Sequence, residues 1–233
     1  MRSYHLTFDI DWAPDFCIEY ILNKLKKQKI KSTFFITHET DIINEIRKDG
    51  HNLGIHPNFL KGSTQGNSEL EIVSNLLNIV PEAKLIRTHS LYSYSFLIQK
   101  IFSEFPELKL DLTTFTYKFP FVKKFYHFFE DIRVEKINFN WEDDVAFFDK
   151  EFDWKEPKLF GDINIFNFHP IHICLNSINN NRYNDLKKEN NNKIKFLTRD
   201  RLSYYKNNGI GTDTFFDNLI NSEFEIIKLH DIQ

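Results

Sequence analysis

Short stretches of β-forming residues alternate with amphipathic helical stretches along the first half of the chain. The strand patterns span residues 4–9, 32–37, 51–56, 85–88 and 108–113, and the helical patterns span residues 14–28, 41–48, 68–80 and 95–105. Strands that alternate with helices pair in parallel through right-handed crossovers, which leaves an open α/β sheet or a barrel. In both architectures function belongs at the carboxyl ends of the strands, so polar residues there are candidate site residues.

The first of these strands ends in a cluster of carboxylates. Apolar and polar residues alternate over residues 4–9, and Asp9, Asp11 and Asp15 follow one another within seven residues. If the extended conformation continues, Asp9 and Asp11 point the same way, and converging carboxylates need a cation, a shared proton or hydrogen-bond donors. Asp15 follows Pro14, which can open a helix, so we interpret Asp15 as a helix-start residue.

The second half of the chain is less regular. The sequence predicts strands over residues 132–139, 163–173 and 224–229 and helices over residues 198–206 and 213–221. The aromatic run 119–129 is predicted to be a loop or short helix that covers the barrel, with an aromatic wall for a sugar or lipid-like substrate as the alternative. Residues 176–193 are rich in Asn and Lys without an apolar period, which predicts a mobile surface loop. We see no repeat or linker, so residues 1–233 are predicted to form one domain.

Composition and charge argue against a nucleic-acid partner and a membrane span, and they favour a cytoplasmic location. The net charge of -3 is spread along the chain, which does not indicate a nucleic-acid surface. The chain has no run of 18 apolar residues, so no membrane span is predicted. No signal-peptide pattern precedes the first strand, so a cytoplasmic location is expected. Cys17 and Cys174 lie far apart in apolar contexts, which predicts buried thiols rather than a disulfide framework.

Four short motifs lie at the ends of predicted strands: TFDID at 7–11, GHNLGIH at 50–56, RTH at 87–89 and FNFHP at 166–170. In this order they resemble the motifs of the polysaccharide deacetylase family. The members of this family are divalent-metal carbohydrate esterases with the NodB-type fold. The resemblance covers about residues 6–172, and it looks nearest to a divergent bacterial branch associated with O-antigen and capsule loci. It implies an α/β fold, a distorted (β/α) barrel with mostly parallel strands.

The resemblance also implies a metal, usually zinc, held by one Asp and two His. Matched to the family motifs, Asp9 would be the general base and Asp11 a metal ligand. His56 matches the first metal-binding His, Arg87 the Arg that orients the base, and His169 the His that acts as general acid. Amide hydrolysis needs such a set, because the carbonyl must be polarised, the attacking water must lose a proton and the leaving amine must gain one. Oxygen and nitrogen ligands without thiolate fit zinc or a similar divalent ion.

The sequence departs from the family at one position that matters for the metal. The family's second metal-binding His lies four residues after the first, where this chain has Leu60. Replacement ligands could be His89, His172, Asn58 or Gln65. His89 ranks first because it lies beside Arg87 at a strand end, so the expected ligand set is Asp11, His56 and His89.

The expected function is a metal-dependent hydrolase that removes an acetyl group from a sugar in surface polysaccharide biosynthesis. The expected substrate is an acetylated sugar, or a nucleotide-linked or lipid-linked sugar, and the expected cofactor is zinc. Two alternatives remain open: a catalytically degenerate carbohydrate-binding relative, which Leu60 favours, and a C–N hydrolase that acts on a small non-sugar amide.

Overall fold

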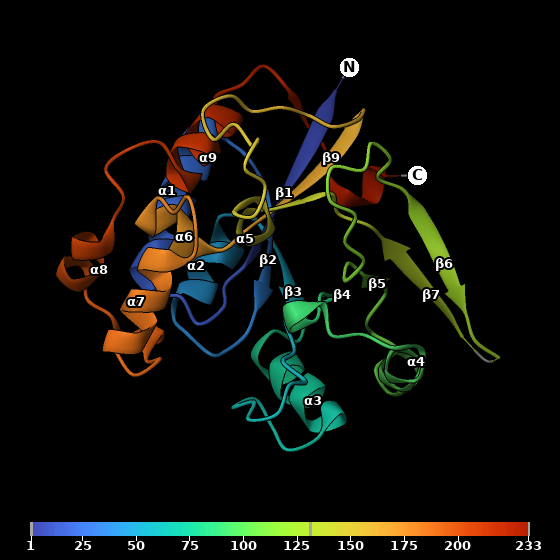
Figure 1. The fold of residues 1–233 in the computed structure, drawn as a ribbon. Coiled ribbons are helices and arrows are strands. Elements are labelled where there is room, and N and C mark those ends of the chain that lie inside the picture. The colour runs from blue at the N-terminus through green and yellow to red at the C-terminus, as the bar shows by residue number, and fades with distance from the viewer. Residues whose placement is uncertain (1, 131, 233) are drawn as a thin grey trace.

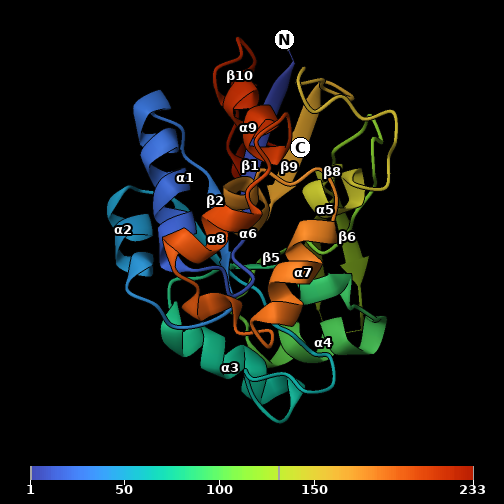
Figure 2. The ribbon, with the colours of Figure 1, turned by 60° about the vertical axis from the view of Figure 1, so that its left-hand side comes forward.

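The computed structural model describes residues 2–130 and 132–232. Its strands form a mostly parallel sheet that curves into a half-barrel, with helices packed around it (Figures 1 and 2). The strand order is β6-β7-β5-β4-β3-β2-β1-β9-β8, and β10 adds to β1. Every pair is parallel except β6 with β7. The predicted α/β class with a distorted barrel is therefore confirmed.

The strands have the following bounds: β1 Ser3–Asp9, β2 Thr33–Ile36, β3 Asn52–Ile55, β4 Leu85–Ile86, β5 Leu110–Asp111, β6 Lys124–Phe128, β7 Arg133–Ile137, β8 Trp141–Glu142, β9 Ile163–Phe168 and β10 Glu225–Ile226. The α-helices are α1 Asp15–Gln28, α2 Ile42–Lys48, α3 Glu69–Ile79, α4 Ser95–Glu104, α5 Asp143–Ala146, α6 Pro170–Leu175, α7 Asn181–Glu189, α8 Arg199–Tyr205 and α9 Thr212–Ile220. Short 3₁₀ turns lie at His89–Leu91, Ile194–Phe196 and Leu229–Asp231.

Three sequence predictions in the second half were wrong. Residues 119–129 do not form a loop or short helix throughout, because Lys124–Phe128 is the edge strand β6, paired antiparallel with β7. This hairpin projects from the side of the molecule in Figure 1. The predicted strand over residues 163–173 ends at Phe168, since Pro170 at the first helical position opens α6 instead.

The third wrong prediction is the loop over residues 176–193, half of which is helix α7. Leu186 is the one fully buried side chain of this helix, and it packs into a cluster with Ile171 and Leu175 of α6. Leu186 and the partly buried Tyr183 are the apolar side chains of α7 in this cluster, and two such residues are too few to give an apolar period in the sequence.

Two layers of apolar side chains hold the sheet in shape. The inner face of the curve carries a cluster that includes Phe35, Leu112, Phe139 and Ile165. The outer face packs against the helices, and Trp141 lies fully buried there, with its ring 5.0 Å from that of Phe215. Trp141 is therefore a core residue.

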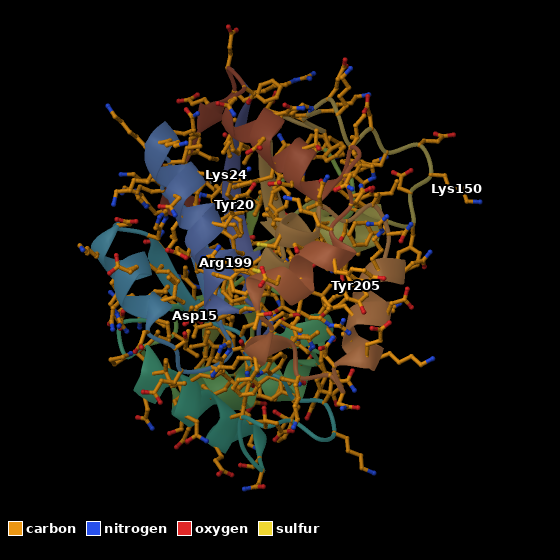
Figure 3. All side chains as sticks on the ribbon, turned by 90° about the vertical axis from the view of Figure 1, so that its left-hand side faces the viewer. Asp15, Tyr20, Lys24, Lys150, Arg199 and Tyr205 are labelled. Atoms are coloured by element: carbon orange, nitrogen blue, oxygen red, sulfur yellow. The ribbon has the colours of Figure 1, made fainter. Side chains whose placement is uncertain are left out.

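The C-terminal helices are tied to the first helix. Tyr20 and Lys24 on α1 both contact the carboxylate of Asp213 in α9, at 2.9 Å each (Figure 3). Cys17 and Cys174 are both free and buried, as predicted. Across residues 2–130 and 132–232, no helix combines the length and the apolar character that crossing a bilayer requires.

Candidate active site and metal centre

The buried end of β1 holds a carboxylate between two hydrogen-bond donors. Asp9 is the last residue of the strand and is only 2% exposed. Its Oδ1 accepts a hydrogen bond from Nη1 of Arg87 at 3.1 Å, and its Oδ2 accepts one from Nδ2 of Asn167 at 2.8 Å. Both oxygens are thus oriented by groups from other strand ends, which fixes the plane of the carboxylate.

Arg87 reaches Asp9 from the residue after β4, through the inside of the half-barrel. Its guanidinium lies between the rings of Phe35 and Phe139, 4.4 and 4.3 Å from their centres. Gly54 in β3 leaves the space for Phe35, because a Cβ there would lie 2.7 Å from the ring. Since the planar guanidinium is stacked on both faces, its position beside Asp9 is rigid.

The chain turns sharply after Asp9. Asp11 and Trp12 have φ of 39° and 54°, in the left-handed region that residues with a Cβ rarely adopt. Ser90 and Leu91, directly after His89, have φ of 53° and 54°. Such strain of about 1–2 kcal/mol per residue persists only where other contacts hold the backbone, and it collects at functional sites.

These two strained segments bring Asp11 and His89 together with His56, which follows β3. Oδ1 of Asp11 lies 3.3 Å from Nε2 of His56 and 3.1 Å from Nδ1 of His89. The two histidine nitrogens lie 3.3 Å apart. Burial alone would raise the pKa of Asp11, but the hydrogen bonds and charge of the two histidines hold it well below its usual value. Three donor atoms thus converge on one point, as in a metal site.

The loop after β3 is held in place by Gln65. Its Nε2 donates to the backbone carbonyls of Thr37 and His56, at 2.9 and 3.1 Å. Its Oε1 accepts from the backbone N–H of Asn58 at 2.6 Å. The side-chain Oδ1 of Asn58 accepts from the backbone N–H of Leu60 at 3.0 Å, so both Gln65 and Asn58 bond to the backbone of this loop. Leu60 is an exposed residue of the same loop, and His89 supplies a nitrogen from the next strand end instead.

His169 follows β9 and is paired with Asp143 at the start of α5. Its Nδ1 lies 2.6 Å from Oδ1 of Asp143, and its backbone N–H donates to Oδ2 at 2.9 Å. Burial opposes the charged imidazolium, but the Asp143 carboxylate, helped by Asp144, raises the pKa of His169 well above its usual value. Nε2 of His169 is directed toward Asp11, 3.7 Å from Oδ2.

Glu142 completes the buried polar network. Nδ2 of Asn167 donates to Oε1 of Glu142 at 2.9 Å as well as to Asp9. Burial, and then the charge of Asp144, raise the pKa of Glu142 to about 8. The raised pKa favours the protonated, uncharged form of Glu142 at neutral pH.

A cavity of about 260 Å³ opens from this cluster to the surface. Asp11, His89, Asp144 and His169 line its inner side, and residues of α7 with the preceding loop line its outer side. His172 also borders the cavity, but its Nδ1 lies 3.2 Å from Oγ of Ser177 and it does not join the three-donor cluster. Burial, and then the charge of His169, lower the pKa of His172 well below its usual value.

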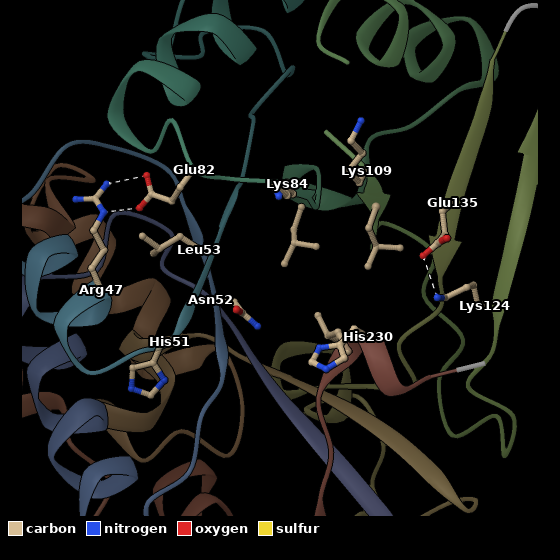
Figure 4. A pocket seen from close by; sticks show the side chains of 13 residues that line it. Arg47, His51, Asn52, Leu53, Glu82, Lys84, Lys109, Lys124, Glu135 and His230 are labelled. Atoms are coloured by element: carbon tan, nitrogen blue, oxygen red, sulfur yellow. Dashed lines mark hydrogen bonds and ion pairs between the residues drawn. The ribbon is translucent and has the colours of Figure 1, made fainter. Parts of the chain in front are cut away.

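A larger cavity of about 470 Å³ lies at the opposite ends of the strands (Figure 4). It borders the first residues of three strands, Asn52, Leu85 and Leu110. Four of its charged side chains form the pairs Arg47–Glu82 and Lys124–Glu135, which the dashed lines in Figure 4 mark. The polar cluster lies at the other end of these strands, where parallel sheets carry their sites.

The structure brings all six predicted site residues into one cluster: Asp9, Asp11, His56, Arg87, His89 and His169. Sequence reasoning missed Asn167 as the link between Asp9 and Glu142, and Asp143 as the partner of His169. A signal for Asn167 was available, because Asn167 lies two residues before His169, and residues two apart along a strand point to the same side.

Comparisons with known proteins identify the family of this chain. Residues 6–187 match the family model described as WbmS-like polysaccharide deacetylase. A crystal structure from Bordetella bronchiseptica, of a candidate polysaccharide deacetylase involved in O-antigen biosynthesis, is 30% identical with a TM-score of 0.77. The match covers 93% of this chain and 89% of that one. No curated protein matches the chain.

More distant structures align over nearly the whole chain. A CE4 family pseudoenzyme from Bacillus anthracis is 13% identical, with 99% of this chain and 65% of that chain covered and a TM-score of 0.45. A peptidoglycan deacetylase from Bdellovibrio bacteriovorus is 14% identical, with 97% and 51% covered and a TM-score of 0.45. The family model covers most of the chain and the Bordetella structure nearly all of it, so this chain belongs to the WbmS-like polysaccharide deacetylases.

Proposed function

We propose that this protein is a metal-dependent deacetylase that removes an acetyl group from a sugar in surface polysaccharide biosynthesis. The observation that carries the proposal is the convergence of Asp11, His56 and His89 next to the Asp9–Arg87 pair. That the substrate is a sugar, either free or joined to a carrier, is itself part of the proposal.

The donor atoms of this cluster fit a divalent metal. Three ligands on the corners of a tetrahedron, with bonds of about 2.1 Å, lie about 3.4 Å from one another. The three donor atoms here lie 3.3, 3.1 and 3.3 Å apart. One carboxylate and two imidazoles, without thiolate, suit zinc and leave a fourth position open. Asp11, His56 and His89 would hold the ion, which would supply a Lewis acid that polarises the acetyl carbonyl and acidifies water.

Asp9 is the proposed general base. It faces the metal cluster through His56, whose Nδ1 lies 3.7 Å from Oδ1 of Asp9. Arg87 and Asn167 orient the carboxylate toward the water that attacks the acetyl carbon. Because Glu142 is protonated at neutral pH, it adds no second negative charge that would repel the base.

His169 is the proposed general acid. Asp143 holds Nδ1 of the ring, so Nε2 points to the cavity, where it can donate a proton to the leaving amine. The raised pKa of His169 keeps this proton on the ring at neutral pH. Breakdown of the tetrahedral intermediate then gives acetate and a free amine on the sugar.

The pH profile of Asp143→Asn tests the acid. A general acid works in its protonated form, so activity should fall as pH rises through the pKa of His169. Removal of the Asp143 carboxylate leaves burial, which lowers that pKa, so the alkaline limb of kcat/KM should move to lower pH. Asp144→Asn should move the limb in the same direction but less, because Asp144 makes no hydrogen bond to His169. An unchanged alkaline limb in Asp143→Asn would show that another group donates the proton.

Acetate release tests the proposed function itself. Purified protein with zinc should release acetate from N-acetylated sugars, and chelation of the metal should stop the release. Failure to release acetate from any acetylated sugar would refute the proposal. In that case, turnover of small amides would favour a C–N hydrolase, and tight sugar binding without turnover would favour a carbohydrate-binding protein.

A further inference from the structure

We infer that the substrate carries its acetylated sugar on a diphosphate, bound by Lys187 and Lys193 along the groove formed by α7 and the segment after it. This inference rests on the proposed function, because it names the class of substrate for the same site. It draws on a part of the chain whose sequence predicts only a surface loop.

Helix α7 places its polar side over the catalytic cavity. Asn180, Tyr183, Asn184 and Lys187 recur at helical spacing and all line the cavity outside the cluster. Leu186 on the other side of the helix is buried and fixes its position. Figure 2 shows α7 in front of the sheet, beside α6 and α8. The helix is therefore a wall of the site that can select substrates.

Lys187 brings a positive charge to this wall. Its ammonium lies 5.1 Å from the centre of the Tyr183 ring, and its charge contributes to the low pKa of His172 inside the cavity. Nearby Arg199 and Arg201 are paired with Glu19 and Glu189. Within residues 2–130 and 132–232, by contrast, no carboxylate lies within ion-pair distance of the Lys187 ammonium. A lysine free of an acidic partner at a cavity wall suits an anionic ligand.

A second cavity, of about 400 Å³, lies on the other side of Trp12, which lines both cavities. The second cavity is bordered by Lys193, Lys195 and the exposed ring of Phe196, and its lining holds no acidic residue. Lys195 donates to the backbone carbonyl of Glu39, whereas Lys193 pairs with no carboxylate in the part of the chain that the structure describes.

The two cavities offer separate places for the parts of a sugar joined to a diphosphate. The acetyl group would lie at Asp11 and His89, the sugar ring beside the asparagines that line the first cavity, and the phosphates at Lys187 and Lys193, on either side of Trp12. Two separate ammonium groups match an extended anion with two phosphates better than they match one carboxylate. Phe196 then offers an apolar surface to whatever the diphosphate carries, a nucleoside or a polyprenol.

Calorimetry with three diphosphate probes tests the inference: inorganic pyrophosphate, uridine diphosphate and farnesyl diphosphate. At least one should bind, and Lys187→Met should weaken it about tenfold or more, as loss of a charged hydrogen bond does. Lys187→Arg should retain most of the binding. Lys188→Met is the matched control, because Lys188 is the next residue of α7, is exposed and does not line either cavity. It should bind the probes like the unmodified protein.

The probes also identify the carrier. Tighter binding of uridine diphosphate than of pyrophosphate supports a nucleotide-linked sugar, and tighter binding of farnesyl diphosphate supports a lipid-linked one. Absence of binding by all three probes, or equal weakening in Lys187→Met and Lys188→Met, would overturn the inference.

Kinetics separate this inference from the proposed function. Lys187→Met should raise KM for a diphosphate-linked N-acetyl sugar by a larger factor than KM for the free N-acetyl sugar, whereas Lys188→Met should change neither. If free sugars are deacetylated but no probe binds, the diphosphate is wrong and the deacetylase stands. If the probes bind through Lys187 but no acetate is released, the deacetylase is wrong and the diphosphate site stands.

Discussion

His56→Ala is expected to remove both the metal and the activity. The unmodified protein should bind about one equivalent of zinc, and loss of the His56 nitrogen leaves Asp11 with one partner. Loss of a residue that only supports a metal ligand costs about 10–100-fold in affinity, so loss of a ligand should cost more than 100-fold. Metal analysis after dialysis, together with acetate release, measures both effects.

The same experiment on His89 and His172 tests the choice of the third ligand. His89→Ala should lose zinc as His56→Ala does, because its Nδ1 lies 3.1 Å from Asp11. His172→Asn should keep zinc, because His172 pairs with Ser177 and lies outside the cluster. The ligand set proposed here fails if His172→Asn loses the metal and His89→Ala retains it.

The sequence predicted the site well where strand ends alone decide the geometry. Asp9, His56 and His169 lie at the ends of strands that pair directly or through one neighbour, so parallel pairing brings them together. Arg87 fits the same logic, since it follows β4. The alternation of strands and helices does not predict the curvature of the sheet. This curvature allows Arg87 to reach Asp9 across the inside of the half-barrel.

The sequence predicted less where a few contacts override local preference. The left-handed conformations at Asp11 and Trp12 have no local signal, because neither residue is glycine. The segment that forms α7 shows abundant Asn and Lys, and its one buried anchor, Leu186, gives no pattern. The roles of Asn167 and Asp143 depend on contacts between strand ends distant in sequence. These features follow from tertiary packing, which short-range patterns do not describe.

The hairpin of β6 and β7 illustrates the same limit. Its aromatic residues were expected to cover the barrel or, alternatively, to line a substrate, but Phe125 and Phe128 of the edge strand β6 are 38% and 69% exposed and do not cover the barrel. A run of aromatic residues favours strand as much as core, and only the position of the strand in the sheet decides which faces are covered.

Asp9→Asn should abolish most of the activity and leave the metal bound. The amide cannot accept the proton of the attacking water, and loss of a general base costs about 10²–10⁴-fold in rate. Asp9 is outside the cluster of Asp11, His56 and His89, so the zinc content should stay near one equivalent. Asp15→Asn is the matched control, since Asp15 lies in the same stretch but is exposed and accepts a hydrogen bond from the exposed hydroxyl of Thr40.

The comparison of the two variants separates catalysis from folding. In Asp9→Asn the NH₂ group of the new amide must face either Nη1 of Arg87 or Nδ2 of Asn167, which are both donors. Two donors that face each other lower the free energy of unfolding by about 1–3 kcal/mol. Chemical denaturation measures that cost, and rates are then compared at a temperature where both variants are folded. If Asp9→Asn is folded, holds its zinc and releases acetate at the rate of Asp15→Asn, then Asp9 is not the base. The carboxylate that takes the proton would then be sought at Asp144, the remaining acid that lines the cavity beside Asp11.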